Sequence, residues 1–334
     1  MATGRYGRSH FFLMATTHPL YVRLHRERSA ESVFRWATVC CAALVLVLLA
    51  GVLLSLAYGA WPALVQFKWH FLTTESWNPV TEKFGALAPI YGTVVTSLIA
   101  MLIAVPLGFG IAVFLTETCP YWLRTPIGIC IELLAAVPSI VFGIWGLFIL
   151  APILQETIQP WLIEHLGPLP VIGALFEGAP YGIGLLTAGL VLAIMVLPFV
   201  TAVMREVFQM TPTSLKEAAY GLGATQWEVV WDVVVPWSRP GVIGGIMLGL
   251  GRALGETMAV TFVVGNAHRI SASLLAPGTT ISAAIANEFT EAVGDLYTSS
   301  LMALGLILFI LTFTVIAGAR LLLLRLERSG GRAV

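Results

Sequence analysis

The feature that most constrains this chain is a set of apolar runs long enough to cross a lipid bilayer. A membrane-spanning helix needs about 20 mostly apolar residues. Five runs meet this length without a single Asp, Glu, Lys or Arg, and they are residues 37–67, 84–116, 133–155, 178–204 and 296–319. A sixth run, 240–264, contains only Arg252 and Glu256 as charges. The runs are continuous and lack a period-two alternation, which predicts helices rather than a barrel.

Composition supports a membrane protein and excludes several other classes. Hydrophobic residues make up 58% of the chain and charged residues 11%, whereas soluble domains carry roughly 25% charge. The 18 basic and 18 acidic residues balance, so there is no basic excess of the kind that nucleic-acid binding requires. We therefore predict an all-α polytopic membrane protein with one transmembrane domain, 36–325. Its six spans are expected near 36–58, 90–115, 127–150, 182–207, 240–264 and 298–324.

The distribution of Lys and Arg predicts the orientation. Fourteen of these residues lie on one side of the predicted spans: Arg5, Arg8, Arg23, Arg26, Arg28, Arg35, Arg124, Arg205, Lys216, Arg239, Arg320, Arg325, Arg328 and Arg332. The other side has only Lys68, Lys83 and Arg269. The excess of positive charge places the N-terminal segment 1–35 and the tail 326–334 in the cytoplasm. The four cysteines then lie near the reducing side, and no disulfide is expected. Translation could start at Met1 or at Met14.

No catalytic or metal-binding pattern is present in the sequence. The three lysines, Lys68, Lys83 and Lys216, do not lie in a GxxxxGK[ST] loop, which a P-loop needs in order to bind phosphates. There is also no HExxH, no GxSxG and no CxxC pair. We expect a chain that is not itself an enzyme and has no cofactor or metal of its own.

Three long loops are predicted on the side opposite to the termini, at 59–89, 151–181 and 266–295. The first contains several tryptophans, which are typical of the membrane interface or could form a docking surface for an extracellular partner. The second contains five prolines and three glutamates but no Lys or Arg.

The cytoplasmic loop 209–238 contains the most informative motif. A short helix is expected before Gly221 and Gly223, and a second one from Thr225 towards Val235, ending before Pro236. An amphipathic hairpin on the membrane surface would explain this pattern equally well.

The same loop resembles the EAA signature of ABC-importer permeases. Glu217-Ala218-Ala219 is followed after three residues by Gly223, and after nine more by Val233-x-Val235-Pro236, where the family has I-x-L-P. The resemblance implies a coupling helix that contacts a separate ATP-binding subunit. ATP and Mg²⁺ would then belong to that partner, which agrees with the missing P-loop. Glu217, Ala218, Ala219 and Gly223 are the predicted coupling residues.

Two charges inside the fifth predicted span indicate a second site. Arg252 and Glu256 are four residues apart, so on a continuous helix they share a face and can pair. A charge at this depth costs about 2.5–3.5 kcal/mol on insertion scales. The pair could simply stabilise helix packing. Alternatively, Arg252 faces a pathway and binds an anion, for which its planar guanidinium is suited. Glu256 and Thr257 would then line the same pathway.

The stretch that contains these charges, RALGETMAV, closely resembles the phosphate-specific ABC permeases, which form the PstC and PstA pair. Stretches that favour the PstC type are 90–93 (IYGT), 104–108 (AVPLG), 131–146, 195–198 and 265–266. The resemblance implies a type I ABC importer fold in a bacterial inner membrane. The implied partners are a PstA-type permease, a PstB-type ATPase dimer and a PstS-type periplasmic phosphate-binding protein. It also implies that Arg252 and Glu256 take part in phosphate passage.

Three residues of the third predicted span leave alternatives open. Glu132 lies about one turn inside the span, and it is solvated at the cytoplasmic interface or lines an inner vestibule. Pro138 and Ser139 lie in mid-span, where a proline kinks a helix. The kink could be a hinge or only a packing device.

The sequence therefore predicts a transmembrane permease subunit of an ATP-driven importer of inorganic phosphate that works by alternating access. Three alternatives remain open. The first is an ABC permease for another oxyanion, such as sulfate or molybdate. The second is a secondary transporter driven by an ion gradient, which would need no coupling motif. The third is a sensing scaffold, because importers of this type are tied to phosphate signalling.

Overall fold

The computed structural model describes residues 19–170 and 172–330, and every regular element in that part of the chain is helical. The α-helices are α1 (Pro19–Phe67), α2 (His70–Thr73), α3 (Leu87–Val113), α4 (Tyr121–Ala136), α5 (Ser139–Trp145), α6 (Ala151–Ile153), α7 (Gln159–Leu166), α8 (Leu185–Gln209), α9 (Thr213–Gly221), α10 (Gln226–Glu228), α11 (Val235–Gly255), α12 (Met258–Val263), α13 (Ile281–Glu288) and α14 (Asp295–Gly330). Short π-helical turns are η1 (Phe114–Thr118), η2 (Gly146–Leu150), η3 (Leu154–Ile158) and η5 (Val229–Val234), and η4 (Gly173–Leu175) is a 3-10 turn.

Six helical segments are long and apolar enough to cross a membrane, judged by length and composition. They are Glu31–Phe67, Leu87–Thr118, Ser139–Leu166, Leu185–Gln209, Gln226–Gly255 and Asp295–Leu321. The prediction of an all-α polytopic membrane protein with six spans is confirmed.

The chain divides into two compact units, 1–55 and 56–334. The described part of the first unit is the larger part of α1, and the second unit contains all other elements. The predicted limits of the transmembrane domain, at residues 36 and 325, both fall inside long helices, α1 and α14. These limits stay predictions.

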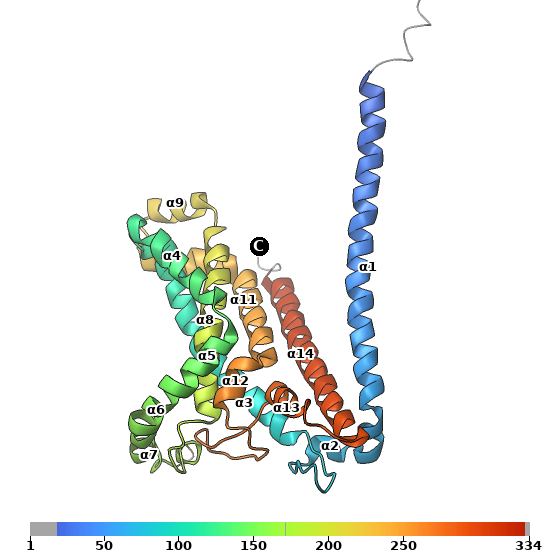
Figure 1. Ribbon diagram of the computed structural model, residues 1–334. Helices are drawn as coiled ribbons and strands as arrows, with labels where there is room; N and C mark the ends of the chain where they lie inside the picture. The colour runs from blue at the N-terminus through green and yellow to red at the C-terminus, as the bar shows by residue number, and fades with distance from the viewer. Residues whose placement is uncertain (1–18, 171, 331–334) are drawn as a thin grey trace, which may run out of the picture. The chain divides into compact units, whose positions relative to one another are not determined.

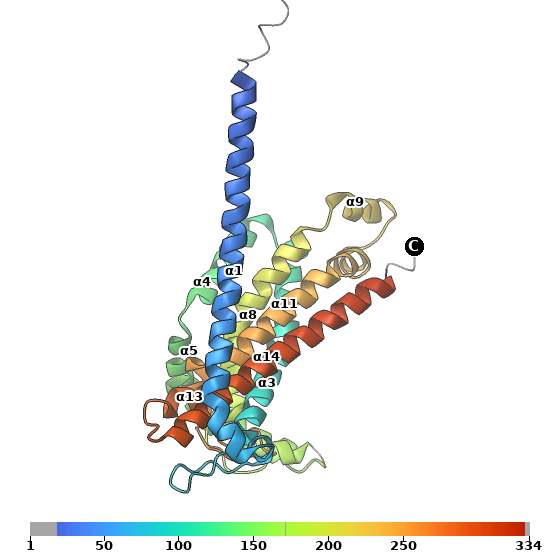
Figure 2. The ribbon, with the colours of Figure 1, turned by 90° about the vertical axis from the view of Figure 1, so that its right-hand side faces the viewer.

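The core of the second unit forms where α8 packs against α3 and α11. Figure 2 shows α8, α11 and α14 side by side. Small residues on α11 allow the close approach to α8: a Cβ atom on Gly249 would lie 2.6 Å from Val200 Cγ2, and one on Gly245 would lie 3.0 Å from Val203 Cγ1. Small residues at helix interfaces are the common device of membrane bundles, because apolar side chains gain little there from leaving lipid.

The third predicted span, 127–150, is interrupted in the structure. Helix α4 ends at Ala136, and Val137 and Pro138 both have extended backbones, with ψ of 129° and 138°. Helix α5 then starts at Ser139. A residue before proline is pushed out of the helical region by the proline ring. The expected mid-span kink is therefore a complete break between two helices, which corrects the prediction.

The segment predicted as the loop 151–181 is helical as far as Leu166. Helix α5 continues through η2, α6 and η3 into α7. Pro152 and Pro160 each occupy a position in the first turn of a helical piece, next to a π-helical turn. A proline there removes no needed N–H group, because the wider turn displaces the hydrogen-bond ladder. The prediction of a loop is therefore wrong for residues 151–166, although this segment contains two prolines.

The two ends of the second unit differ in structure. Helix α9 lies at one end, and α2 and α7 lie at the opposite end (Figure 1).

Near α2, four side chains form what we call the Glu288 cluster. Trp77 Nε1 and Tyr297 Oη donate to Glu288 Oε2 at 2.6 and 2.7 Å, and His268 Nε2 lies 2.6 Å from Oε1. The Trp77 ring stacks on His268. Residues of two separate loops are thereby joined to α13 and α14.

Electrostatics in the Glu288 cluster favour the charged carboxylate. Burial by itself raises the pKa of Glu288, but hydrogen bonds from His268, Tyr297 and Trp77 and the charge of His268 outweigh it. The pKa of Glu288 is therefore lowered from its ordinary value.

Candidate functional site

The fifth predicted span, 240–264, is broken at the charged motif. Helix α11 ends at Gly255, Glu256 is extended with φ −69° and ψ 132°, and α12 starts at Met258. The backbone groups at the break have partners: Ser282 Oγ donates to the Glu256 carbonyl at 2.8 Å, and Ala259 N–H donates to Glu256 Oε1 at 3.4 Å. An irregular backbone inside a membrane is stable only where the protein satisfies it in this way. The predicted continuous helix is therefore wrong at this point.

The break also separates the two charges that the sequence places on one helix face. Within the part of the chain that the structure describes, Arg252 and Glu256 form no ion pair with each other. The Arg252 guanidinium instead lies over the ring of Phe199 on α8, with 5.9 Å between Cζ and the ring centroid. The i, i+4 pairing was expected from a regular helix, and this helix ends one residue before Glu256. The interpretation as a self-neutralising pair is corrected.

The position of Arg252 constrains what lies next to it. Its side chain is exposed on this chain, near the end of a spanning segment that continues, after the break, into α12. Arg252 lies inside the candidate span Gln226–Gly255, and an exposed arginine within a spanning segment is costly against lipid. We therefore expect the face of α11 that carries Arg252 to contact water or another protein surface rather than lipid tails.

Thr257 belongs to the same break. It precedes α12, its side chain is half-buried, and its Oγ1 lies 3.4 Å from the Gly255 carbonyl. The structure thus brings Arg252, Glu256 and Thr257 to one interruption of the fifth span. Phe199 and Ser282, which complete this arrangement, come from distant segments and gave no signal in the sequence.

Glu132 has a partner that the sequence did not predict. Its Oε1 accepts a hydrogen bond from Arg205 Nη2 on α8 at 2.6 Å, and its side chain is 57% exposed. The pair joins α4 to the end of α8. Pro138 and Ser139 form the start of α5 and contribute no polar side-chain contact among the described residues.

The predicted coupling residues lie on and after α9. Glu217 and Ala218 are exposed, and Ala219 is half-buried against the core. Gly223 has φ +90°, which ends the helix in a conformation that favours glycine. Thr225 and Glu228 then form a capping box, with Thr225 N–H donating to Glu228 Oε2 at 2.7 Å.

The second predicted helix of this loop does not end before Pro236. The chain passes from α10 through the π-helical turn η5 directly into α11, with Pro236 in its first turn. Because the π turn widens the ladder just before the proline, the missing N–H is tolerated. From Gln226 onward, the loop and the fifth span therefore form one helical segment.

An ion pair anchors α9 to the rest of the fold. Lys216 Nζ lies 2.5 Å from Glu117 Oε1, and the side chains are only 18% and 8% exposed. Gln226 Nε2 donates to the Glu117 carbonyl at 2.6 Å. Glu117 belongs to η1, which extends α3. Sequence reasoning missed this contact because 99 positions separate its partners.

Comparisons with known proteins agree with the geometry. The family model for the binding-protein-dependent transport system inner membrane component matches residues 104–328. The phosphate transport system permease protein PstC of Mesorhizobium japonicum is 64% identical over 308 residues, covering 92% of this chain and 94% of that protein. The PstC protein of Pasteurella multocida is 59% identical over 302 residues, covering 90% and 94%.

A solved structure shares the fold. A chain of a bacterial alginate ABC transporter, in complex with an alginate-bound periplasmic protein, matches with a TM-score of 0.56 and 14% identity. The match covers 86% of this chain and 94% of that chain. On the evidence of the family model and of these relatives, the chain is a multi-pass membrane protein that belongs to the binding-protein-dependent transport system inner membrane components, among the PstC permeases.

Proposed function

We propose that this chain is the transmembrane permease subunit of an ATP-driven importer of inorganic phosphate. The observation that carries the proposal is the exposed guanidinium of Arg252 beside a break in a spanning helix. Broken helices mark substrate sites in many transporters. The relatives are phosphate transport system permease proteins, which supports phosphate as the substrate.

Arg252 has the chemistry that a tetrahedral oxyanion requires. Its planar guanidinium can donate two parallel, charge-assisted hydrogen bonds to a phosphate group. Glu256 is directed to the first turn of α12 instead of to Arg252. The guanidinium therefore keeps its donors for a ligand, while the Phe199 ring supports it from one side.

The proposal includes an assembly. The Arg252 face would line a pathway shared with a PstA-type permease, and the exposed Glu217 side of α9 would dock on a PstB-type ATPase dimer that holds ATP and Mg²⁺. A PstS-type periplasmic protein would deliver phosphate at the end that carries the Glu288 cluster. The transporter would lie in the bacterial inner membrane with both termini of this chain in the cytoplasm, as its Lys and Arg distribution favours.

Arg252 can be tested with a matched arginine on the same helix. We expect Arg252→Ala to reduce phosphate uptake at least tenfold, because no other group at the break compensates the desolvated anion. Arg239→Ala removes the same charge from an exposed position near the start of α11, and it should retain uptake. Arg252→Lys should fall between the two, since one ammonium cannot reproduce the bidentate contact.

Assembly and ATP hydrolysis are measured on the same samples. Arg252 has no ion-pair partner among the described residues, so its loss should leave the complex intact. Normal uptake by a correctly assembled Arg252→Ala transporter would contradict the pathway role.

A further inference from the structure

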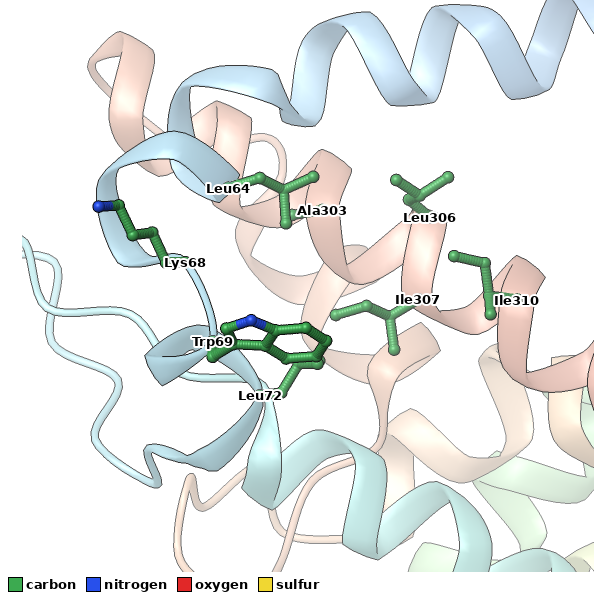
Figure 3. A pocket seen from close by; sticks show the side chains of 8 residues that line it. All are labelled: Leu64, Lys68, Trp69, Leu72, Ala303, Leu306, Ile307 and Ile310. Atoms are coloured by element: carbon green, nitrogen blue, oxygen red, sulfur yellow. The ribbon is translucent and has the colours of Figure 1, made fainter.

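An apolar groove of about 380 Å³ lies on the surface of the second unit, at the end opposite to α9. Leu64 of α1 and Leu72 of α2 form one wall, and α14 forms the other from Ala303 to Ile310 (Figure 3). Trp69 lies between the two walls. The one charged residue of the lining is Lys68. A groove of this composition suits a hydrocarbon chain with an anionic group at one end.

The α14 wall of the groove lies within a candidate membrane span. The candidate span of α14 starts at Asp295, and Ala303 and Ile310 follow it by roughly 12 and 22 Å of helix. Measured along the helix from Asp295, these two residues lie on either side of the middle of a core that is about 30 Å thick. An acyl chain is the apolar molecule that is always present there.

Lys68 is placed unusually at the mouth of this groove. It has φ +49°, a left-handed backbone conformation that favours glycine. Its N–H donates to the Leu64 carbonyl at 2.9 Å, so this conformation ends α1. A lysine at a glycine position is strained, and such outliers point to a function for the side chain.

Lys68 directly follows the candidate span Glu31–Phe67, so its charge lies at the end of that span. In Figure 3 its ammonium points away from the apolar walls, at the end of the groove farthest from Ile310. It forms no ion pair with any residue between 19 and 330 that the structure describes. Trp69 beside it is 81% exposed. A neighbouring lysine and tryptophan are the side chains that proteins place at lipid headgroups.

We propose that this groove binds an anionic phospholipid, with one acyl chain along α14 and the headgroup phosphate on the Lys68 ammonium. A bound lipid would fill the space between α2 and α14 next to the Glu288 cluster. The site is separate from the Arg252 break and does not depend on the transported substrate.

Native mass spectrometry of the assembled transporter tests the proposal. The complex is released from nanodiscs that contain equal amounts of phosphatidylglycerol, the anionic probe, and phosphatidylethanolamine. We expect Lys68→Gln to lower the retained phosphatidylglycerol about tenfold at this site, the effect of one charge-assisted contact. Lys83→Gln is the matched control, because Lys83 is an exposed lysine between α2 and α3 and outside the groove.

Two further variants keep the test independent of folding. Lys68→Gly suits the left-handed backbone, so it should fold well and still lose the lipid. Ile307→Trp should fill the groove and displace both lipids. Unchanged phosphatidylglycerol in Lys68→Gly or Ile307→Trp would overturn the proposal, and so would a full complex that retains no lipid because a partner subunit covers the groove.

Discussion

At the residue scale, the ion pair between Lys216 and Glu117 is the contact that holds α9 to the end of α3. Both side chains are largely buried, and Gln226 binds the Glu117 carbonyl as well. Breaking a buried pair leaves an uncompensated charge and typically costs 3–5 kcal/mol. The EAA motif predicted Glu217 as a coupling residue, and its side chain is exposed and thus available to a partner. Lys216, its neighbour, makes the internal contact.

A charge exchange tests this pair. Glu117→Lys alone should leave ATP hydrolysis by the assembled transporter intact and reduce uptake at least tenfold, because two positive charges would push α9 away from η1. Lys216→Glu alone should do the same. The double variant restores opposite charges and should recover most of the uptake, which is measured together with ATP hydrolysis.

The control for this exchange is Glu206→Lys, since Glu206 is exposed and near the end of α8. It should transport normally. A double variant as defective as the single ones would show that the contact does not transmit movement.

At the element scale, the sequence predicts where helices exist better than where they break. Long apolar runs without charges predicted α3, α8 and α14, because burial and length in a bilayer dictate a helix. The break after Gly255 could not be predicted, since the group that satisfies it, Ser282, comes from a different element. Pro138 indicated an irregularity in the third span, but not whether the helix would kink or end there, because prolines inside spanning helices are often tolerated. Pro106 and Pro198 lie inside α3 and α8 without breaking them.

Helix packing in the core predicts opposite effects on stability for alanine substitutions at two glycines of α11. Gly249→Ala would place a methyl group 2.6 Å from Val200 Cγ2, a fully buried side chain. Overpacking of this kind costs about 1–3 kcal/mol. Gly244→Ala meets nothing within 4 Å, and it should be neutral or stabilising by up to about 1 kcal/mol.

Thermal unfolding in detergent followed by tryptophan fluorescence compares the two variants. The midpoint should fall for Gly249→Ala and stay or rise for Gly244→Ala. Equal midpoints would mean that α11 and α8 are not packed as closely as described.

At the scale of the whole molecule, the described contacts form a continuous route from α9 to the Arg252 break. Lys216 joins α9 to η1 and thus to α3, α3 packs on α8, and α8 packs on α11, which carries Arg252. The passage from α10 through η5 into α11 provides a second, covalent route. Movement of α9 by a partner would reach the break through helix packing, whereas the covalent route includes the turn 222–225 between α9 and α10. The sequence predicted both ends of this route from motifs, but the route itself depends on contacts between distant residues.

The most direct test of the central claim is labelled phosphate uptake into proteoliposomes. They contain this chain with a PstA-type permease and a PstB-type ATPase, with ATP inside, the phosphate-binding protein outside and excess sulfate as a competitor. We predict uptake that requires ATP and the binding protein and that sulfate does not reduce. An assembled complex that hydrolyses ATP but takes up no phosphate, or whose uptake sulfate abolishes, would contradict the account.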